Sequence, residues 1–131
     1  MNDPCFLTAD EVLRVHQSLI DVYGGSHGLR DEGLFRSAIG MPEASFGGQY
    51  LHNDLFEMAA AYLFHLVQNH PFLDGNKRIG AAAAILFLAM NELRIAADEE
   101  GLVEITLRTA QGKCAKPEIA AFFRQRVLPK E

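Results

Sequence analysis

Cysteine is scarce in this chain of 131 residues. The only two, Cys5 and Cys114, lie near opposite ends and form no Cys-x-x-Cys pair. This spacing indicates free thiols, as expected of a protein in a reducing compartment.

A targeting signal and a long apolar run are also missing. The start, Met1–Pro4, has neither the basic residues nor the apolar stretch of a signal peptide. The longest stretch without a polar side chain, Ile79–Met90, has twelve residues, whereas a membrane-spanning helix needs about 20. We therefore expect a cytoplasmic protein with no membrane partner.

Positive charge is in deficit. Twelve Lys and Arg residues against 17 Asp and Glu residues give a formal net charge of −5. Direct binding to nucleic acid is not expected, because it needs a broad positive field. Hydrophobic residues at 49% and charged residues at 22% are typical of a globular chain. The length predicts a single domain, residues 1–131, that buries roughly two-thirds of its surface.

Helical periodicity is the main pattern that the sequence does contain. Thr8–Glu11 is a capping-box pattern, apolar residues follow it at spacings of three or four, and Gly24 ends the helix. Similar signals predict five more helices, over Asp31 to near Gly40, Asp54 to about Gln68, Ile79–Met90, Asp98–Thr109 and Pro117–Val127. The apolar Ile79–Met90 helix should be surrounded by others, and Pro117 should take the first helical position. The predicted fold is an all-α bundle of about six helices.

The segment Ser45–His52 is the only strand candidate. Gly47 and Gly48 lie between two short runs that each contain an aromatic residue. This arrangement predicts a short β-hairpin.

The segment His70–Arg78 carries the chemistry. It contains a glycine, a small polar residue and two cations just before the apolar helix. A helix start suits phosphate binding, because free backbone N–H groups and the positive end of the helix dipole face outward there. Arg78 can bind phosphate oxygens bidentately, and Lys77 can add a mobile point charge.

The same segment offers a metal ligand and a general base. Asp74 is its one carboxylate, and Mg²⁺ bound to a polyphosphate prefers carboxylate oxygen. His70 is the segment's one imidazole, the residue type that most often accepts a hydroxyl proton near neutral pH. Together these residues are typical of phosphoryl or nucleotidyl transfer to a hydroxyl.

Structural explanations exist for single residues. Asp74 could be only the N-cap of the next helix, worth about 1 kcal/mol, while Pro71 fixes a turn and Phe72 anchors the loop. The segment is no Walker A loop, since the required glycine and the Ser or Thr are absent. His65 and His70 are five residues apart with a proline after the second, which does not suit a helical zinc pair.

At these residues the chain resembles the Fic/Doc family, whose signature is His-Pro-Phe-x-Asp/Glu-Gly-Asn-Gly/Lys-Arg. The likeness extends through residues 28–34 and 46–48 to the end of the apolar helix. It implies a helical core with the active loop between two central helices, and a hairpin flap that aligns the target. The flap residues would be Ser45, Phe46, Gly47, Gly48, Gln49, Tyr50 and Leu51.

The resemblance also implies roles for the loop residues. His70 would be the catalytic base and Asp74 the Mg²⁺ ligand. The phosphate-binding turn would be formed by Gly75, Asn76, Lys77 and Arg78. Pro71 and Phe72 would be structural.

Two departures distinguish the chain from the AMP-transferring branch of the family. Lys77 stands where those enzymes have a second glycine, and Ala81 where they have a second arginine. A lysine should crowd the backbone nest that glycine leaves open, and an alanine cannot clamp a polyphosphate. Both residues match the death-on-curing (Doc) branch, the toxins of toxin–antitoxin modules. That branch implies phosphoryl transfer from ATP to a threonine of elongation factor Tu, which blocks translation. AMP transfer and a catalytically silent binding module remain the alternatives.

A self-inhibitory motif, Ser/Thr-x-x-x-Glu-Gly/Asn, is absent. The two Glu-Gly pairs, at 32–33 and 100–101, have Gly28 and Ala96 four residues before the glutamate. We therefore predict a trans-acting antitoxin, with a disordered segment that folds as a helix into an apolar groove.

Overall fold

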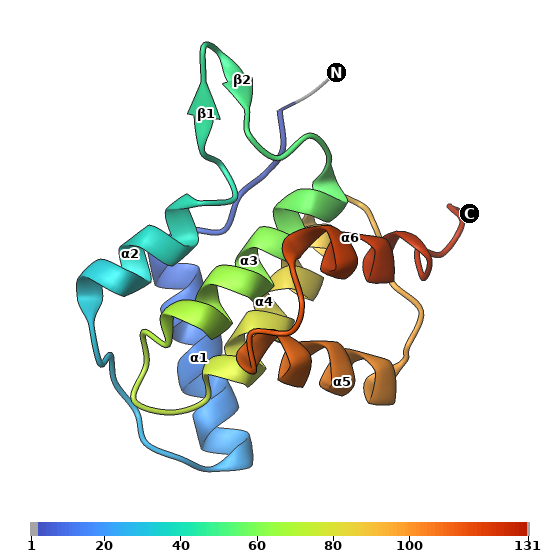
Figure 1. The fold of residues 1–131 in the computed structure, drawn as a ribbon. Coiled ribbons are helices and arrows are strands. Elements are labelled where there is room, and N and C mark those ends of the chain that lie inside the picture. The colour runs from blue at the N-terminus through green and yellow to red at the C-terminus, as the bar shows by residue number, and fades with distance from the viewer. Residues whose placement is uncertain (1–2, 131) are drawn as a thin grey trace.

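The computed structural model describes residues 3–130 and contains six helices and one hairpin (Figure 1). The elements in chain order are α1 (Ala9–Tyr23), α2 (Glu32–Gly40), β1 (Ser45–Phe46), β2 (Gln49–Tyr50), α3 (Leu55–Asn69), α4 (Asn76–Met90), α5 (Glu99–Ala110) and α6 (Lys116–Arg124). The predicted all-α bundle with a short hairpin is confirmed.

Side-chain caps determine where most helices begin. In the capping box of α1, the Glu11 N–H donates to Thr8 Oγ1 at 3.1 Å and the Thr8 N–H donates to Glu11 Oε1 at 2.8 Å. Asp31, Asp54 and Asp98 each accept from the backbone N–H three residues later. Each such cap contributes about 1 kcal/mol. Because each capping residue lies three residues before the N–H that it binds, these helix starts could be predicted from the sequence.

The last helix differs from its prediction. It begins at Lys116, so Pro117 is its second residue, and it ends at Arg124 rather than Val127. The end is early because Val127 forms an antiparallel bridge with Ile95. The pairing gives the backbone near Val127 hydrogen bonds that a longer helix would have supplied.

Helices α3 and α4 pack against each other at the centre of the fold. Helices α2, α5 and α6 contact α3, while α1 and α5 contact α4 (Figure 1). The apolar helix was predicted to be surrounded by other helices, and this is true of its inner face. The buried residues of that face are Ile79, Ala83, Ala84, Phe87 and Leu88. Ala89 on its outer face stays exposed.

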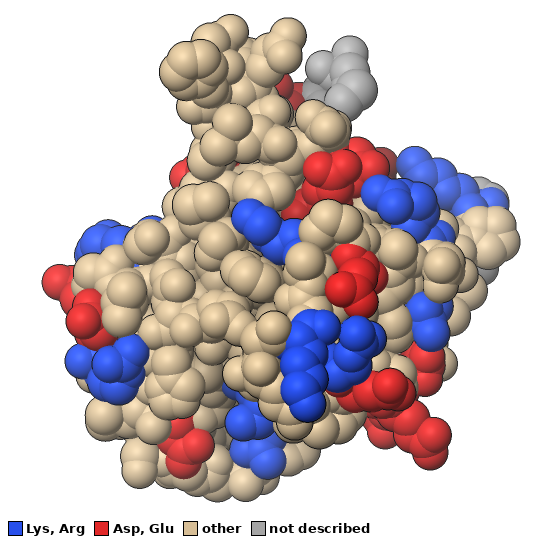
Figure 2. Space-filling view, in the orientation of Figure 1, with Lys and Arg blue, Asp and Glu red and all other residues tan. Residues whose placement is uncertain are grey.

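The hairpin projects from the bundle beside the start of α3 (Figure 1). Its strands pair antiparallel, with Ser45 opposite Tyr50 and Phe46 opposite Gln49. Gly47 and Gly48 both have positive φ, +60° and +80°, as a two-residue hairpin turn requires. It carries no charged side chain (Figure 2), and Phe46 is 83% exposed at its end.

Cys5 and Cys114 are free thiols, as predicted. None of the helices within residues 3–130 is long and apolar enough to cross a membrane.

Candidate active site

The loop that joins α3 to α4 begins in a strained conformation. His70 ends α3 with φ 52° and ψ 53°, in the left-handed region, which costs a residue other than glycine about 1 kcal/mol. Arg30 lies across this helix end. Its guanidinium donates to the carbonyl oxygens of His70 at 2.7 Å and of Asn69 at 3.0 Å. Arg30 therefore caps α3 and stabilises the backbone at His70, a role that the sequence did not reveal.

The middle of the loop is held by the segment before α2. The N–H groups of Arg30 and Asp31 both donate to the Pro71 carbonyl, at 2.7 and 3.1 Å. The Leu73 N–H donates to the Gly28 carbonyl at 3.0 Å. These bonds form a minimal antiparallel bridge between Leu29 and Phe72, so the loop is not a free surface loop.

Helix α1 supports the loop from inside the protein. Phe72 is 1% exposed, and the His16 ring stacks on it with centroids 3.7 Å apart. His16 Nε2 donates to the Asp74 carbonyl at 2.8 Å. Burial lowers the pKa of His16, so the neutral ring that donates this bond is favoured. His16 is a second positioning residue that sequence reasoning missed.

Asn76 closes the loop from the other end. Its side-chain oxygen accepts from the Phe72 N–H at 2.9 Å, and its side-chain nitrogen donates to the Phe72 carbonyl at 3.0 Å. The residue is buried. The amide side chain thus closes the loop with one bond from each of its polar atoms, and the backbone N–H of Asn76 is left for the predicted phosphate-binding turn.

Asp74 is not the N-cap of α4. Gly75 takes that position, in the left-handed conformation and without a side-chain cap bond. Asp74 instead accepts from the Gly75 N–H at 2.8 Å and from the Ser26 N–H at 3.2 Å, one bond on each oxygen. A Cβ on Gly25 would lie 2.6 Å from Asp74 Oδ2. The loop after α1 therefore orients the carboxylate, and its remaining lone pairs are free.

The start of α4 presents cations and free donors. Lys77 and Arg78 are exposed, and the Arg78 guanidinium lies 4.8 Å from the centroid of the Tyr23 ring. The backbone N–H groups of residues 76–78 have no hydrogen-bond partner among the described residues. Because these N–H groups are also the positive end of the helix dipole, they suit an anion.

The residues predicted to act as base, metal ligand and phosphate-binding cations line one pocket of about 440 Å³. Its lining includes His70, Asp74, Lys77 and Arg78. Asp74 is a single carboxylate, and the residues described contain no cluster of three or more His, Cys, Asp or Glu that could hold a metal ion. A lone carboxylate beside a phosphate site fits Mg²⁺, which is commonly held by one or two carboxylates, by phosphates and by water.

The predicted flap is not brought to this pocket. The hairpin precedes the start of α3, whereas the loop that carries His70 follows the end of α3 (Figure 1). None of residues 45–51 lines the pocket. A helix of 15 residues is roughly 22 Å long at 1.5 Å per residue. A target paired with the hairpin would thus need about seven extended residues to reach His70.

A helical bundle with this loop between its central helices defines a class of protein. The family model for the Fic/DOC family matches residues 6–88. The chain belongs to the Fic/Doc family.

Two relatives cover most of the chain. It is 31% identical to the protein named "Protein kinase doc" of Escherichia phage P1. The alignment of 119 residues covers 91% of this chain and 93% of that protein. It is 36% identical over 106 residues to the protein named "Toxin Doc" of Mycolicibacterium smegmatis, covering 76% and 82% of the two chains.

Proposed function

We propose that this protein is a toxin of the Doc type that transfers the γ-phosphoryl group of ATP to a Thr or Ser hydroxyl of a protein. The observation that carries the proposal is the pocket that His70, Asp74, Lys77 and Arg78 line together at the start of α4. The names of the two relatives, a protein kinase and a toxin, support the same reaction and role.

His70 acts as the general base in this proposal. Its exposed ring accepts the proton of the target hydroxyl as the hydroxyl oxygen bonds to the γ-phosphorus. The bond from that phosphorus to the bridging oxygen breaks, and ADP leaves with the electron pair. Arg30 keeps the His70 backbone in place during this step.

The start of α4 binds the phosphates. The free N–H groups of residues 76–78 and the Arg78 guanidinium stabilise the negative charge that the transferred group carries. Mg²⁺, when bound, supplies charge neutralisation at the phosphates, and Asp74 is the residue that would hold it. The Ser26 N–H keeps the Asp74 carboxylate oriented for this purpose.

Phosphoryl transfer is favoured over AMP transfer by residues 77 and 81. The exposed Lys77 side chain stands at the second free N–H of the helix. Ala81 has no side chain that could clamp a second phosphate, and it lines an apolar hollow with Leu102, Val103 and Leu107. These contacts support the Doc type of reaction.

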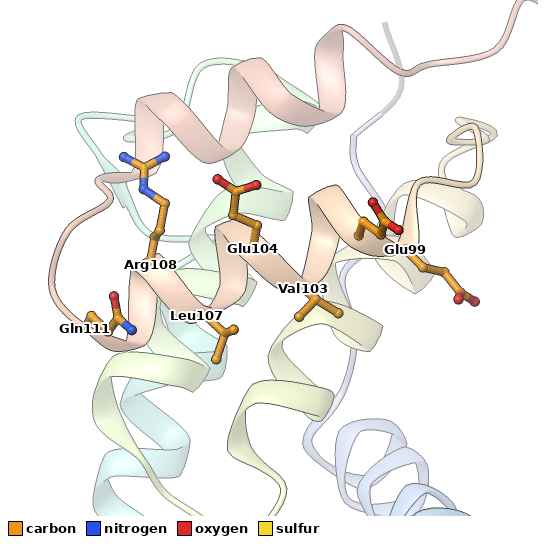
Figure 3. Close-up of a pocket in the computed structure, with 7 residues that line it drawn as sticks. Glu99, Val103, Glu104, Leu107, Arg108 and Gln111 are labelled. Carbon is orange, nitrogen blue, oxygen red and sulfur yellow. The ribbon is translucent and has the colours of Figure 1, made fainter.

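An antitoxin that acts in trans would bind beside this site. The apolar hollow of about 230 Å³ is lined by Lys77 and Arg78 on one side and by α5 on the other. Val103 and Leu107 are 57% and 41% exposed, and Figure 3 shows them along one side of α5, with Glu104 and Arg108 pointing the other way. An antitoxin helix placed on Val103 and Leu107 would also cover Lys77 and Arg78. It would thereby block phosphate binding.

Labelled ATP tests the reaction. The protein is incubated with elongation factor Tu, Mg²⁺ and ATP labelled at either the γ- or the α-phosphate. Label from the γ-position should appear on the factor and be lost in His70→Ala. Transfer of the α-label alone would refute the kinase and support AMP transfer, and no transfer of either label to this factor would refute the proposed target.

Asp74→Asn separates the metal ligand from a structural role. Asparagine keeps one of the two side-chain oxygens that accept backbone N–H bonds, so the fold should persist, while the charge that binds Mg²⁺ is removed. We expect loss of transfer with an unchanged circular dichroism spectrum. Full activity in this variant would show that Asp74 is structural.

A further inference from the structure

Tyr23 is an exposed aromatic residue to which the proposed reaction gives no role. It is the last residue of α1, is 63% exposed, and does not line the pocket at His70. The Arg78 guanidinium lies over its ring, with Cζ 4.8 Å from the ring centroid. A separation below about 6 Å is within the range of a cation–π contact. This contact joins the end of α1 to the phosphate-binding start of α4.

The contact with the ring leaves the hydrogen-bond donors of Arg78 free. Within residues 3–130, the arginine side chains that form hydrogen bonds or ion pairs are those of other arginines. A guanidinium donates in its own plane, whereas an aromatic ring covers its face. Arg78 lines the pocket together with His70 and Asp74. Its donors are therefore available for bidentate binding of a phosphate beside the proposed base.

Two other residues of α1 support the same loop. His16 Nε2 donates to the Asp74 carbonyl at 2.8 Å. Ile20 packs so closely on Gly75 that a Cβ there would lie 3.1 Å from Ile20 Cδ1. Positions 16, 20 and 23 are four and three residues apart, so they share one face of the helix. Tyr23 thus continues, along this face, the support that α1 gives to the site.

The ring of Tyr23 makes the contact, and its hydroxyl does not. Within residues 3–130, the one tyrosine hydroxyl with a hydrogen-bond partner is that of Tyr62. A phenylalanine at position 23 would keep an aromatic face for the cation, whereas a leucine would offer apolar surface without a π-system. These two substitutions therefore separate the cation–π contact from packing in general.

We propose that Tyr23 is a positioning residue that holds the Arg78 guanidinium in the orientation in which it binds the phosphates of ATP. The inference rests on the proposed function, because it takes Arg78 as a phosphate ligand. A guanidinium that is already fixed by the ring loses less side-chain freedom when the ligand binds. Without the ring, the cost of ordering this long side chain should weaken binding about two- to tenfold.

The test measures binding of the Mg²⁺ complex of β,γ-methylene ATP by isothermal titration calorimetry. Tyr23→Leu should raise the Kd about two- to tenfold, and Tyr23→Phe should bind like the unmodified protein. Val22→Ala is the matched control, because Val22 precedes Tyr23 in α1 and is 73% exposed, and its Kd should not change. Circular dichroism verifies that each variant is folded.

A double-mutant comparison identifies Arg78 as the partner. In the Arg78→Met background the cation is gone, so Tyr23→Leu should have no further effect on the Kd. The inference is overturned if Tyr23→Leu alone changes the Kd by less than about twofold, or if Tyr23→Phe binds as weakly as Tyr23→Leu. It is equally overturned if Tyr23→Leu weakens binding to the same extent with and without Arg78.

The Arg78→Met variant also separates this inference from the proposed function. Weak binding by Arg78→Met together with normal binding by Tyr23→Leu would overturn the role of Tyr23 and leave the phosphate site standing. Normal binding by Arg78→Met would overturn both the role of Tyr23 and that of Arg78.

Discussion

Replacing Arg30 should slow phosphoryl transfer without weakening ATP binding. Arg30 touches no residue of the phosphate site, but its guanidinium holds the carbonyls of Asn69 and His70 at the end of α3. In Arg30→Met the side chain keeps similar length and loses both bonds. The left-handed backbone of His70, φ 52°, then has no cap to stabilise it.

The size of the effect follows from these two bonds. Each contributes about 0.5–1.5 kcal/mol net, and because Arg30 is exposed the lower half of that range applies. Their loss totals about 1–2 kcal/mol, comparable to the cost of the left-handed conformation at His70. A shift of about 1.4 kcal/mol changes a population or a rate tenfold. We expect kcat to fall about tenfold and the unfolding free energy to fall by about 1 kcal/mol.

Steady-state kinetics with γ-labelled ATP measure the split between kcat and KM. The matched control is Arg36→Met, since Arg36 is also exposed and, within residues 3–130, its one ion pair is with Glu32, at 3.6 Å within α2. Arg30→Lys should recover part of kcat, because a lysine can reach one carbonyl at a time. A kcat of Arg30→Met within twofold of the unmodified protein, or a rise in the KM for ATP alone, would refute a positioning role.

Two further predictions concern the loop and pH. Gly25→Ala and Gly24→Ala both force alanine to a positive φ, +120° and +88°, and each should cost roughly 1 kcal/mol of stability. Of the two added Cβ atoms, only the one at Gly25 meets Asp74, at 2.6 Å. Only Gly25→Ala should therefore raise the Mg²⁺ concentration needed for half-maximal transfer. An equal Mg²⁺ dependence in both variants would contradict the orienting contact. The pKa values of His16 and His65 are lowered in the folded state, that of His65 to about 4. The unfolded chain therefore binds more protons below about pH 6.5, and the unfolding free energy should decline from pH 6.5 toward pH 4. Urea denaturation at several pH values measures this, and His65→Leu should flatten the decline; a stability that rises as the pH falls from 6.5 would contradict it.

Most of the secondary structure could be predicted because its signals are local. The caps at Thr8, Asp31, Asp54 and Asp98 lie within three residues of the N–H groups that they bind. The hairpin turn needed only two adjacent glycines. Where the prediction failed, at the end of α6, the deciding contact was with Ile95, about thirty residues away.

The sequence by itself determined which residues are the candidates for the reactive groups. His70, Asp74, Lys77 and Arg78 lie within nine residues, so their spacing alone indicated a phosphate site, and the structure places all four around one pocket. The same short segment did not reveal that the Asn76 side chain is occupied at Phe72, because that depends on how the loop closes.

Only the tertiary structure decided what holds these groups in place. Arg30 lies 40 residues from His70 in the sequence, and His16 lies 58 from Asp74. Contacts of this range arise when the helices pack, and no spacing rule within one segment encodes them. The chemistry of the loop is local because one helix start supplies its donors. The orientation of the side chains in the loop is not determined locally. The strained backbone at His70 and the carboxylate of Asp74 are held by hydrogen bonds to residues that come close only when the helices pack.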